Sequence, residues 1–142
     1  MWSSARLTEY IQRRLLQEKI IWVATVRPNG APHLTPVWFV WHADRLYICI
    51  SPTSRKARNL ASNPRVALSL EDGRNVVIVE GVAEPANSEE RASVAALFLD
   101  KYDWDILTDT TYTLLLRIVP EKFMAWGDEA QAEQNKKEVD KR

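Results

Sequence analysis

The clearest chemical signal in the sequence is a group of three cations with no acid beside them. Residues 54–60 read Ser-Arg-Lys-Ala-Arg-Asn-Leu, which predicts a short helix over residues 55–61 with Ser54 as its N-cap. Cations in the first turn of a helix are unfavourable, because that end already carries partial positive charge. A phosphate bound there would accept hydrogen bonds from the helix N–H groups, the Ser54 hydroxyl, Arg55 and Lys56. The alternative is that these side chains only extend into solvent.

A second signal is a proline inside a strand-like segment, Thr35-Pro36-Val37-Trp38. Proline cannot donate a hydrogen bond to a neighbouring strand, so Pro36 indicates a sheet edge, a bulge or the opening of a barrel. Backbone groups left unpaired at such a point could bind the edge of a flat heterocycle. The simpler interpretation is an irregular edge strand without a ligand.

The remaining candidates carry less chemistry. The six tryptophans are expected mostly in the core or at interfaces, and Trp126 is a candidate ligand neighbour because Gly127 beside it permits close backbone approach. His33 and His42 have no third metal ligand at a useful spacing, so no metal site is predicted. Cys49 is the only cysteine, which excludes an intrachain disulfide, and its place within a strand favours a small buried hydrophobe.

Catalytic side chains are not identifiable from the pattern. No Ser-His-Asp arrangement and no glycine-rich phosphate loop is present among the four glycines. Tyr47, Lys101 and Tyr112 are possible proton donors, but nothing in the sequence selects one of them. Chemistry carried by a cofactor would explain why no catalytic set is apparent.

Hydrophobic periodicity then supplies the elements that position these residues. Spacings of three and four predict a helix over residues 7–18, starting near Thr8, and Ser88 is expected to cap a second long helix that reaches Tyr102. Strands are predicted at residues 20–26, 34–41, 46–50, 66–70, 76–83 and 112–118, with a further short strand at 123–126. Because residues 37–41 are apolar throughout, that strand is expected to be covered on both faces. The order of these helices and strands along the chain indicates a small antiparallel barrel with helices at its ends.

Composition limits the class of protein. The chain has 142 residues, 46% of them hydrophobic and 27% charged, which indicates one globular domain and excludes disorder over most of the chain. Nineteen basic residues balance nineteen acidic ones, so binding to nucleic acid through phosphate neutralisation is not expected. No apolar run is long enough to cross a membrane, and residues 1–6 do not resemble a secretion signal. We therefore expect a cytoplasmic protein.

Three segments together resemble one family. Residues 24–38, 54–68 and 80–83 are similar, in that order, to the opening hairpin, the cofactor phosphate motif and the next strand of the pyridoxamine 5'-phosphate oxidase-like split barrels. The similarity extends over residues 7–126. Within that family the chain most resembles the flavin and deazaflavin oxidoreductases, which use FMN or the deazaflavin coenzyme F-420.

The resemblance implies a mainly β fold with peripheral helices: a six-stranded antiparallel split β-barrel that forms a homodimer, with cofactor sites at the subunit interface. The barrel would occupy residues 1–127, and residues 128–142 would form a charged tail, frayed or helical. The resemblance also implies a role for ten residues. Ser54, Arg55 and Lys56 would hold the cofactor phosphate. The isoalloxazine would be lined by the backbone of Thr35, Pro36, Val37 and Trp38. Ser51 and Asn59 would lie near the ribityl chain or phosphate, and Trp126 of this or the other subunit would approach the ring.

Two departures from the founding enzyme matter. His33-Leu34-Thr35 stands where true pyridoxamine phosphate oxidases carry an arginine, and the residues after Trp126 lack their arginine-rich substrate segment. Vitamin synthesis is therefore not expected, and the implied activity is hydride transfer between FMN and a small organic substrate. F-420 is the alternative cofactor, and its longer tail would need further cations such as Arg58 or Arg27. A haem-binding barrel with His33 or His42 as axial ligand, and a non-catalytic flavin-binding module, are the rival functions.

Overall fold

The computed structural model describes residues 3–5 and 7–140, so Trp2 lies outside the described residues. In the described part of the chain, eight strands and four helices follow one another. They are β1 (Ser3–Ala5), α1 (Glu9–Gln17), β2 (Ile21–Val26), β3 (Pro32–Val37), β4 (Val40–His42), β5 (Arg45–Ile50), α2 (Arg55–Ser62), β6 (Arg65–Leu70), β7 (Val76–Pro85), α3 (Ser88–Tyr102), β8 (Leu114–Trp126) and α4 (Asp128–Asp140).

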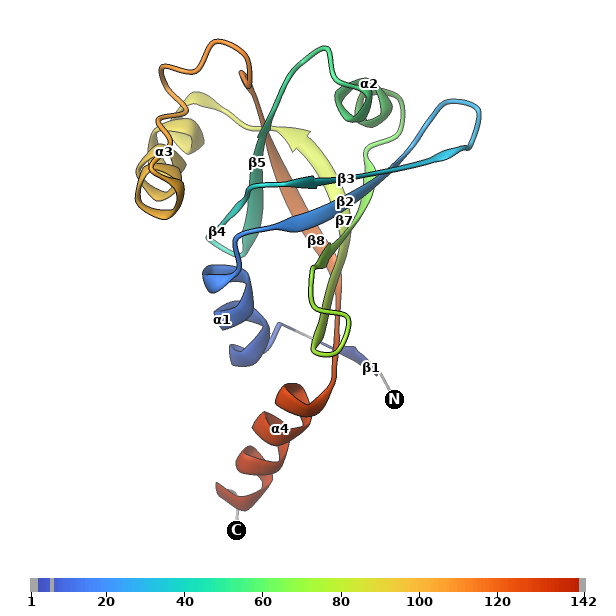
Figure 1. The fold of residues 1–142 in the computed structure, drawn as a ribbon, viewed down its shortest axis with the longest axis vertical. Helices are drawn as coiled ribbons and strands as arrows, with labels where there is room; N and C mark the ends of the chain where they lie inside the picture. Colours follow the sequence, from blue (N-terminus) through green and yellow to red (C-terminus); the bar gives the residue numbers. More distant parts are fainter. Residues whose placement is uncertain (1–2, 6, 141–142) are drawn as a thin grey trace.

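All the strands belong to one curled antiparallel sheet, a half-barrel (Figure 1). Its order is β3-β2-β6-β7-β8-β5-β4, and β1 pairs with the far end of β8. The mainly β, antiparallel class is therefore confirmed in the form of a curled half-barrel, but the strand number is not: the described residues form eight strands, where six were predicted. The sheet stays open between β3 and β4, which leaves β3 at an edge, as Pro36 predicts.

One difference in strand number arises because the predicted strand at 34–41 is two strands. The break falls at Trp38 and Phe39, where the backbone pairs with α3 instead of a neighbouring strand. The Phe39 N–H donates to the Tyr102 hydroxyl at 3.0 Å, and the Phe39 carbonyl accepts from the Lys101 ammonium at 3.0 Å. The expectation that residues 37–41 are covered on both faces is confirmed for Phe39, Val40 and Trp41, which are buried, and is wrong for Trp38, which is 46% exposed.

A second difference is that the segments predicted at 112–118 and 123–126 form one strand, β8, which begins at Leu114. Pro120 lies within it because the β7–β8 register shifts between Glu80 and Gly81, and a bulge tolerates a residue without an N–H. The two strands approach closely there: a Cβ built on Gly81 would lie 2.3 Å from the Val119 carbonyl oxygen. This contact fixes glycine at the position.

Two groups of buried residues stabilise the fold. One lies between the sheet and α1 and includes Ile11, Leu15, Ile21 and Ile48. The other packs α3 against β4, β5 and β8, with Phe98 fully buried at its centre. Burial of this much apolar surface provides the main stabilisation of the fold. The second group also fixes where α3 ends, and with it the start of the following loop.

The helix caps are partly as predicted. Thr8 caps α1 and Ser54 caps α2, each accepting a backbone N–H of the first turn. The N-cap of α3 is Asn87, not Ser88: Asn87 and Glu90 form a capping box, in which each side chain accepts the other residue's N–H. The cap therefore lies one residue earlier than expected.

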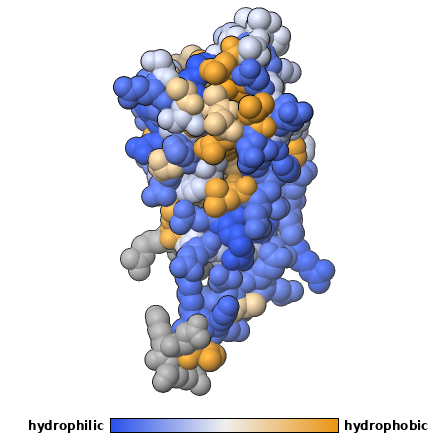
Figure 2. Space-filling model, turned by 90° about the vertical axis from the view of Figure 1, so that its left-hand side faces the viewer, coloured by the Kyte–Doolittle hydropathy of each residue, from blue (hydrophilic) through white to orange (hydrophobic). Residues whose placement is uncertain are grey.

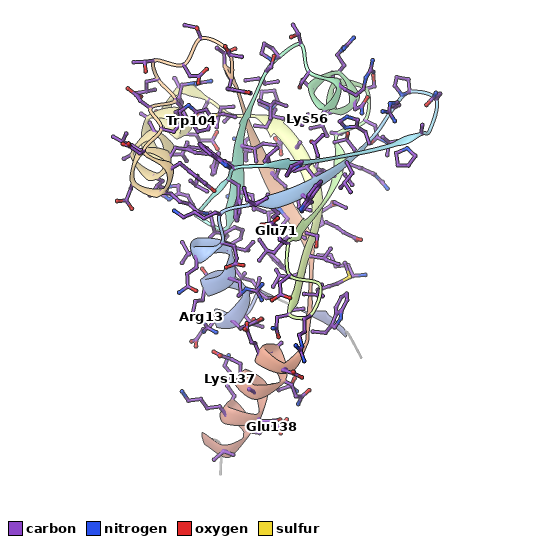
Figure 3. All side chains as sticks on the ribbon, in the orientation of Figure 1. Arg13, Lys56, Glu71, Trp104, Lys137 and Glu138 are labelled. Atoms are coloured by element: carbon purple, nitrogen blue, oxygen red, sulfur yellow. The ribbon has the colours of Figure 1, made fainter. Side chains whose placement is uncertain are left out.

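The C-terminal segment is helical, one of the two alternatives for the tail. Helix α4 extends away from the sheet (Figure 1), and its first turns contact α1. The Tyr10 hydroxyl donates to Glu129 at 3.0 Å, and Arg13 pairs with Glu133 at 3.3 Å. Figure 3 shows Arg13 on α1 near the start of α4, with Lys137 and Glu138 farther along the helix. Among the described helices, none combines the length and apolar character that crossing a bilayer requires.

Candidate functional site

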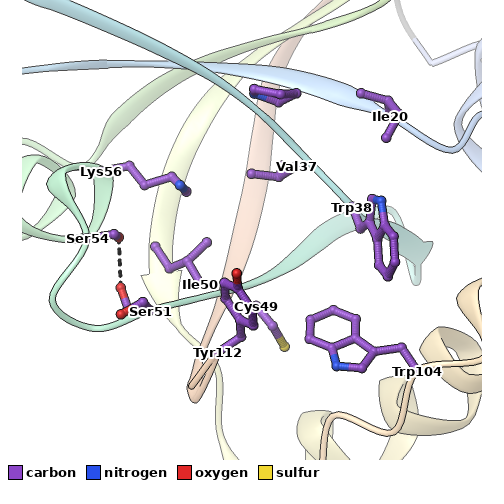
Figure 4. Close-up of a pocket in the computed structure, with 11 residues that line it drawn as sticks. Ile20, Val37, Trp38, Cys49, Ile50, Ser51, Ser54, Lys56, Trp104 and Tyr112 are labelled. Atoms are coloured by element: carbon purple, nitrogen blue, oxygen red, sulfur yellow. Dashed lines mark hydrogen bonds between the residues drawn. The ribbon is translucent and has the colours of Figure 1, made fainter. Parts of the chain in front are cut away.

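A pocket of about 460 Å³ lies where the N-terminus of α2, the end of β3, the end of β5 and the loop between α3 and β8 meet (Figure 4). Its lining residues are Ile20, Pro36, Val37, Trp38, Cys49, Ile50, Ser51, Ser54, Lys56, Trp104 and Tyr112. Figure 4 shows Lys56, Ser54 and Ser51 on one side and Trp38 and Trp104 on the other. The pocket therefore has a polar, cationic end and an aromatic end.

Six of the ten predicted cofactor residues line this pocket: Pro36, Val37, Trp38, Ser51, Ser54 and Lys56. The other four do not line it. Thr35 and Arg55 are next to residues that do, and Asn59 lies one turn farther along α2. Trp126 lies at the other end of β8, paired with Val76 and followed by α4. Within this chain the fold does not bring Trp126 to the pocket.

The cationic end has unsatisfied capacity to bind an anion. No described carboxylate forms an ion pair with Arg55, Lys56 or Arg58, although five other pairs are present in the described chain. The backbone N–H groups of Arg55 and Lys56 also find no acceptor among the described residues. The Lys56 side chain reaches into the pocket, where burial lowers the pKa of its ammonium. Free N–H groups and unpaired cations at a helix N-terminus are the components of a phosphate site.

Ser54 takes part differently from the prediction. Its hydroxyl accepts the Ala57 N–H at 3.2 Å and donates to the Ser51 carbonyl at 2.7 Å, so the hydroxyl hydrogen is already engaged. Ser54 thus caps the helix and ties it to the turn at residues 51–54. Direct donation to a phosphate requires the bond to Ser51 to open.

Arg55 and Asn59 form hydrogen bonds that connect the first turn of α2 to the sheet. Asn59 is fully buried and donates to the Thr25 hydroxyl of β2 at 3.0 Å. Arg55 donates to the Asn59 side-chain oxygen at 3.4 Å. Because a buried amide must be paired, this contact fixes the position of α2 on the sheet. Asn59 therefore holds the helix in place, without itself lining the pocket.

Two buried polar atoms without partners lie on β3 beside this helix. They are His33 Nδ1 and Thr35 Oγ1, on the face that the register places next to Thr25 and Val23. Burial lowers the pKa of His33, and the charges of Arg27, Lys56 and Arg55 lower it further. Buried polar atoms without partners are uncommon in folded proteins. The free N–H groups and unpaired cations of the first turn of α2 fit a phosphate group, and these two atoms lie beside that turn without lining the pocket.

Four lining residues were not assigned to the site from the sequence, namely Ile20, Cys49, Ile50 and Trp104, and a fifth, Tyr112, was named only as a possible proton donor. Trp104 and Tyr112 come from the loop after α3, and nothing local in the sequence indicates that this loop reaches β3. Cys49 is 7% exposed, and burial raises the pKa of its thiol to about 11. The interpretation of Cys49 as a buried hydrophobe is confirmed, although it also lines the pocket.

Of the three possible proton donors, only Tyr112 lines this pocket. Tyr47 donates to Glu90 at 2.7 Å, and burial raises its pKa to about 12. That pair lines a separate polar hollow of about 380 Å³, which also contains His42. Lys101 donates to the Phe39 carbonyl, and burial lowers its pKa to about 8.

Comparisons with known proteins agree with the fold. An F-420 reductase is 24% identical, with a TM-score of 0.68 over 82% of this chain and 98% of the reductase. HutZ, the haem storage protein from Vibrio cholerae, is 24% identical, with a TM-score of 0.69 over 84% of this chain and 94% of HutZ. Rv2991, a conserved hypothetical protein from Mycobacterium tuberculosis, is 26% identical, with a TM-score of 0.74 over 87% of this chain and 86% of that one.

No curated protein matches the chain. The family model described as pyridoxamine 5'-phosphate oxidase, however, matches residues 7–127, a range that includes the whole pocket. On this match, which covers most of the sequence, the chain belongs to the pyridoxamine 5'-phosphate oxidase family.

Proposed function

We propose that the protein is a flavin-dependent oxidoreductase that binds FMN and transfers hydride to or from a small organic substrate. The observation that carries this proposal is the cationic end of the pocket, where Lys56 and the free N–H groups of the first turn of α2 have no described anionic partner. FMN ends in a phosphate, and family membership makes a flavin the first choice of ligand. F-420 also carries a phosphate and is the alternative cofactor.

The phosphate would be held by residues at the start of α2. The N–H groups of Arg55 and Lys56 would donate to its oxygens, and the Lys56 ammonium would balance its charge. His33 Nδ1 and Thr35 Oγ1, both without a partner, supply further polar groups beside this turn. Asn59 would keep α2 in place on the sheet through its hydrogen bond to Thr25.

The flat ring would lie against the backbone of Pro36 and Val37 of β3, between the cationic end and the aromatic end of the pocket. Because β3 is the last strand on its side of the sheet, one of its edges carries backbone groups that no described strand pairs. Val37 and Ile50 line the middle of the pocket and would exclude water from the ring. When bound, the cofactor supplies the two-electron chemistry, and the protein contributes binding, orientation and an apolar enclosure.

A homodimer is part of the proposal. The face of β2 and β3 that points away from the core carries exposed apolar side chains: Leu34 is 60% exposed, Trp38 46% and Val26 36%. The register places Trp22 beside Pro36 and Ala24 beside Leu34 on that same face. A second copy covering this surface would bury it next to the pocket, and sedimentation analysis tests whether it does. We also propose a cytoplasmic location.

The first experiment identifies the cofactor. FMN, F-420 and haem are each titrated into the purified protein and followed by absorbance and fluorescence. We expect saturable binding of FMN, or of F-420 in its place. A Soret band with no flavin or deazaflavin binding would instead favour a haem protein, and a bound flavin that no reductant and acceptor turn over would favour a non-catalytic module.

The second experiment tests the residues. Replacing Lys56 with Ala should weaken FMN binding about tenfold or more, because a hydrogen bond to a charged group contributes about 1.5–3 kcal/mol. Lys136→Ala, which removes an exposed lysine from α4, is the matched control. Arg58→Ala removes an exposed cation from the same helix and should leave FMN binding unchanged while weakening F-420 binding. Equal FMN affinity in the Lys56 variant and the wild type would remove Lys56 from the site.

A further inference from the structure

The aromatic end of the pocket is built by the loop between α3 and β8. This loop runs from Asp103 to Thr113, and it supplies Trp104 and Tyr112 to the lining. Asp103 begins it in a left-handed conformation, with φ of 53°, which turns the chain out of α3. The loop thus faces the end of β3 across the pocket (Figure 4).

Trp104 is the centre of a group of aromatic rings. Its ring meets those of Trp38, Phe98 and Tyr112 edge-on, with centroid distances of 5.8, 5.4 and 6.1 Å. Trp38 is in turn stacked on Tyr102, at 4.6 Å with 6° between the planes. These contacts hold the rings that line the pocket in fixed orientations before any ligand binds.

One carboxylate holds both loop aromatics. Asp109 Oδ2 accepts the Trp104 indole N–H at 2.9 Å, and Asp109 Oδ1 accepts the backbone N–H groups of Thr111 and Tyr112 at 2.8 Å each. These hydrogen bonds also lower the pKa of the Asp109 carboxyl. Asp109 touches neither the pocket nor any described cation, so its contacts serve to place the two rings.

The chemistry of this end favours an uncharged ligand. Its lining consists of Ile20, Cys49 and the aromatic side chains, and the Cys49 thiol is neutral because its pKa is about 11. The entrance is open to solvent, since Tyr112 is 48% exposed. Figure 2 shows apolar residues gathered over the upper part of the molecule on the side of α3, while the surface around α4 is mostly hydrophilic. Exposed large apolar residues of this region are Leu99, Leu107 and Tyr112.

We infer that this aromatic end is a separate subsite for an uncharged, planar aromatic ring, and that Asp109 is the positioning residue that shapes it. A flat ring entering here meets the Trp38 ring, whose other face is stacked on Tyr102, and the rings of Trp104 and Tyr112. Aromatic pairs in stacked or edge-on geometry attract beyond simple burial, so a flat ring is preferred to a saturated one. That this ring belongs to the second reactant rests on the proposed function.

The test compares 2-naphthol with decahydro-2-naphthol, two uncharged probes that share a bicyclic frame and a hydroxyl. Calorimetric titration should show that the wild type binds 2-naphthol about tenfold more tightly than the saturated analogue. Protein loaded with FMN should bind 2-naphthol as tightly as protein without it. Competition between the two would place both in one space and overturn the separate subsite, and so would equal affinity for the two probes.

Asp109→Asn tests the positioning role. An amide offers only one acceptor atom, so either the Trp104 N–H or the two backbone N–H groups lose their partner. We expect the preference for 2-naphthol to fall about fivefold or more, with a changed near-ultraviolet circular dichroism signal from the rings. Asp105→Asn is the matched control, because Asp105 lies in the same loop and its side chain accepts, among the described residues, only the Leu107 N–H. An unchanged preference in Asp109→Asn would overturn the role of Asp109.

Tyr112→Leu provides a variant that does not disturb the Asp109 contacts, which reach Tyr112 only through its backbone. It keeps the apolar bulk and removes one ring, so the preference for 2-naphthol should fall while binding of the saturated probe stays the same. If the preference is retained, the subsite is not formed by these rings. Titrations of FMN and 2-naphthol into the wild type separate the two hypotheses: no FMN binding with an intact 2-naphthol preference contradicts the proposed function alone, and FMN binding without a 2-naphthol preference contradicts the subsite alone.

Discussion

The ion pairs at the start of α3 allow one prediction to be developed in detail. Arg117 of β8 pairs with Glu90 and, at 2.9 Å, with Glu84. Glu90 also accepts the Asn87 N–H at 3.0 Å and the Tyr47 hydroxyl at 2.7 Å. Burial alone would raise the pKa of Glu90, but hydrogen bonds from Arg117, Asn87 and Tyr47 outweigh it and hold the pKa at about 2.

The perturbation is Glu90→Gln, which keeps the shape and the cap but removes the charge. A carboxyl pKa lowered from 4.5 to about 2 corresponds to about 3 kcal/mol of stabilisation at neutral pH, at about 1.4 kcal/mol per tenfold. The Glu90 side chain is 18% exposed, and solvent screening reduces that figure. We therefore expect Glu90→Gln to lower the free energy of unfolding by roughly 2 kcal/mol at pH 7.

The sign of the pH dependence follows from the lowered pKa. Because the folded protein holds Glu90 charged more readily than the unfolded chain does, the stabilisation is complete above the unfolded pKa. It is lost as the pH falls towards the folded pKa of about 2. By the same linkage, roughly half of the difference between wild type and Glu90→Gln should disappear between pH 5 and pH 3.

Urea unfolding at a series of pH values measures this difference. Glu89→Gln is the matched control, since Glu89 lies in the same first turn of α3 but forms no ion pair among the described residues. It should change stability by only a few tenths of a kcal/mol. A difference for Glu90→Gln that does not vary with pH, or one as small as that of the control, would refute the reasoning.

Two further predictions concern the packing that supports the pocket. Gly81→Ala should lower the free energy of unfolding by about 1–3 kcal/mol, because the new methyl group would lie 2.3 Å from a backbone carbonyl oxygen. Gly73→Ala should leave it almost unchanged in the same urea titration, because a Cβ at Gly73 has no atom within 4 Å. Phe98→Ala should lower the free energy of unfolding by about 3–5 kcal/mol, because it empties the centre of the α3 core. Leu99→Ala should lower it far less, because Leu99 is 50% exposed. Similar unfolding midpoints for the Phe98 and Leu99 variants would contradict the assignment of that core.

Features governed by neighbouring residues were predictable from the sequence. Ser54 caps α2, and α1 begins next to Thr8, as the local pattern indicates. The proposal of an anion site also came from one continuous segment, since three cations at a helix start conflict with the helix dipole unless an anion lies nearby. Such signals act over one or two turns, so the sequence alone contains them.

Features that depend on distant segments were not predictable. The strand at 34–41 breaks because the backbone of Phe39 pairs with Lys101 and Tyr102, more than sixty positions away. The expected break between the strands at 112–118 and 123–126 is absent because Gly81 on the neighbouring strand permits a bulge. In both cases the decision depends on which partner the fold presents to the backbone.

The composition of the pocket divides in the same way. Its cationic end comes from a local helix signal, whereas its aromatic end exists only because the packing of Phe98 fixes where α3 delivers the loop that carries Trp104 and Tyr112. The same packing sets Trp38 opposite that loop, while β8 carries Trp126 to the other end of the sheet. Residue type determined what each side chain can do, and long-range packing decided which of them meet, because contact between distant segments requires a common buried core.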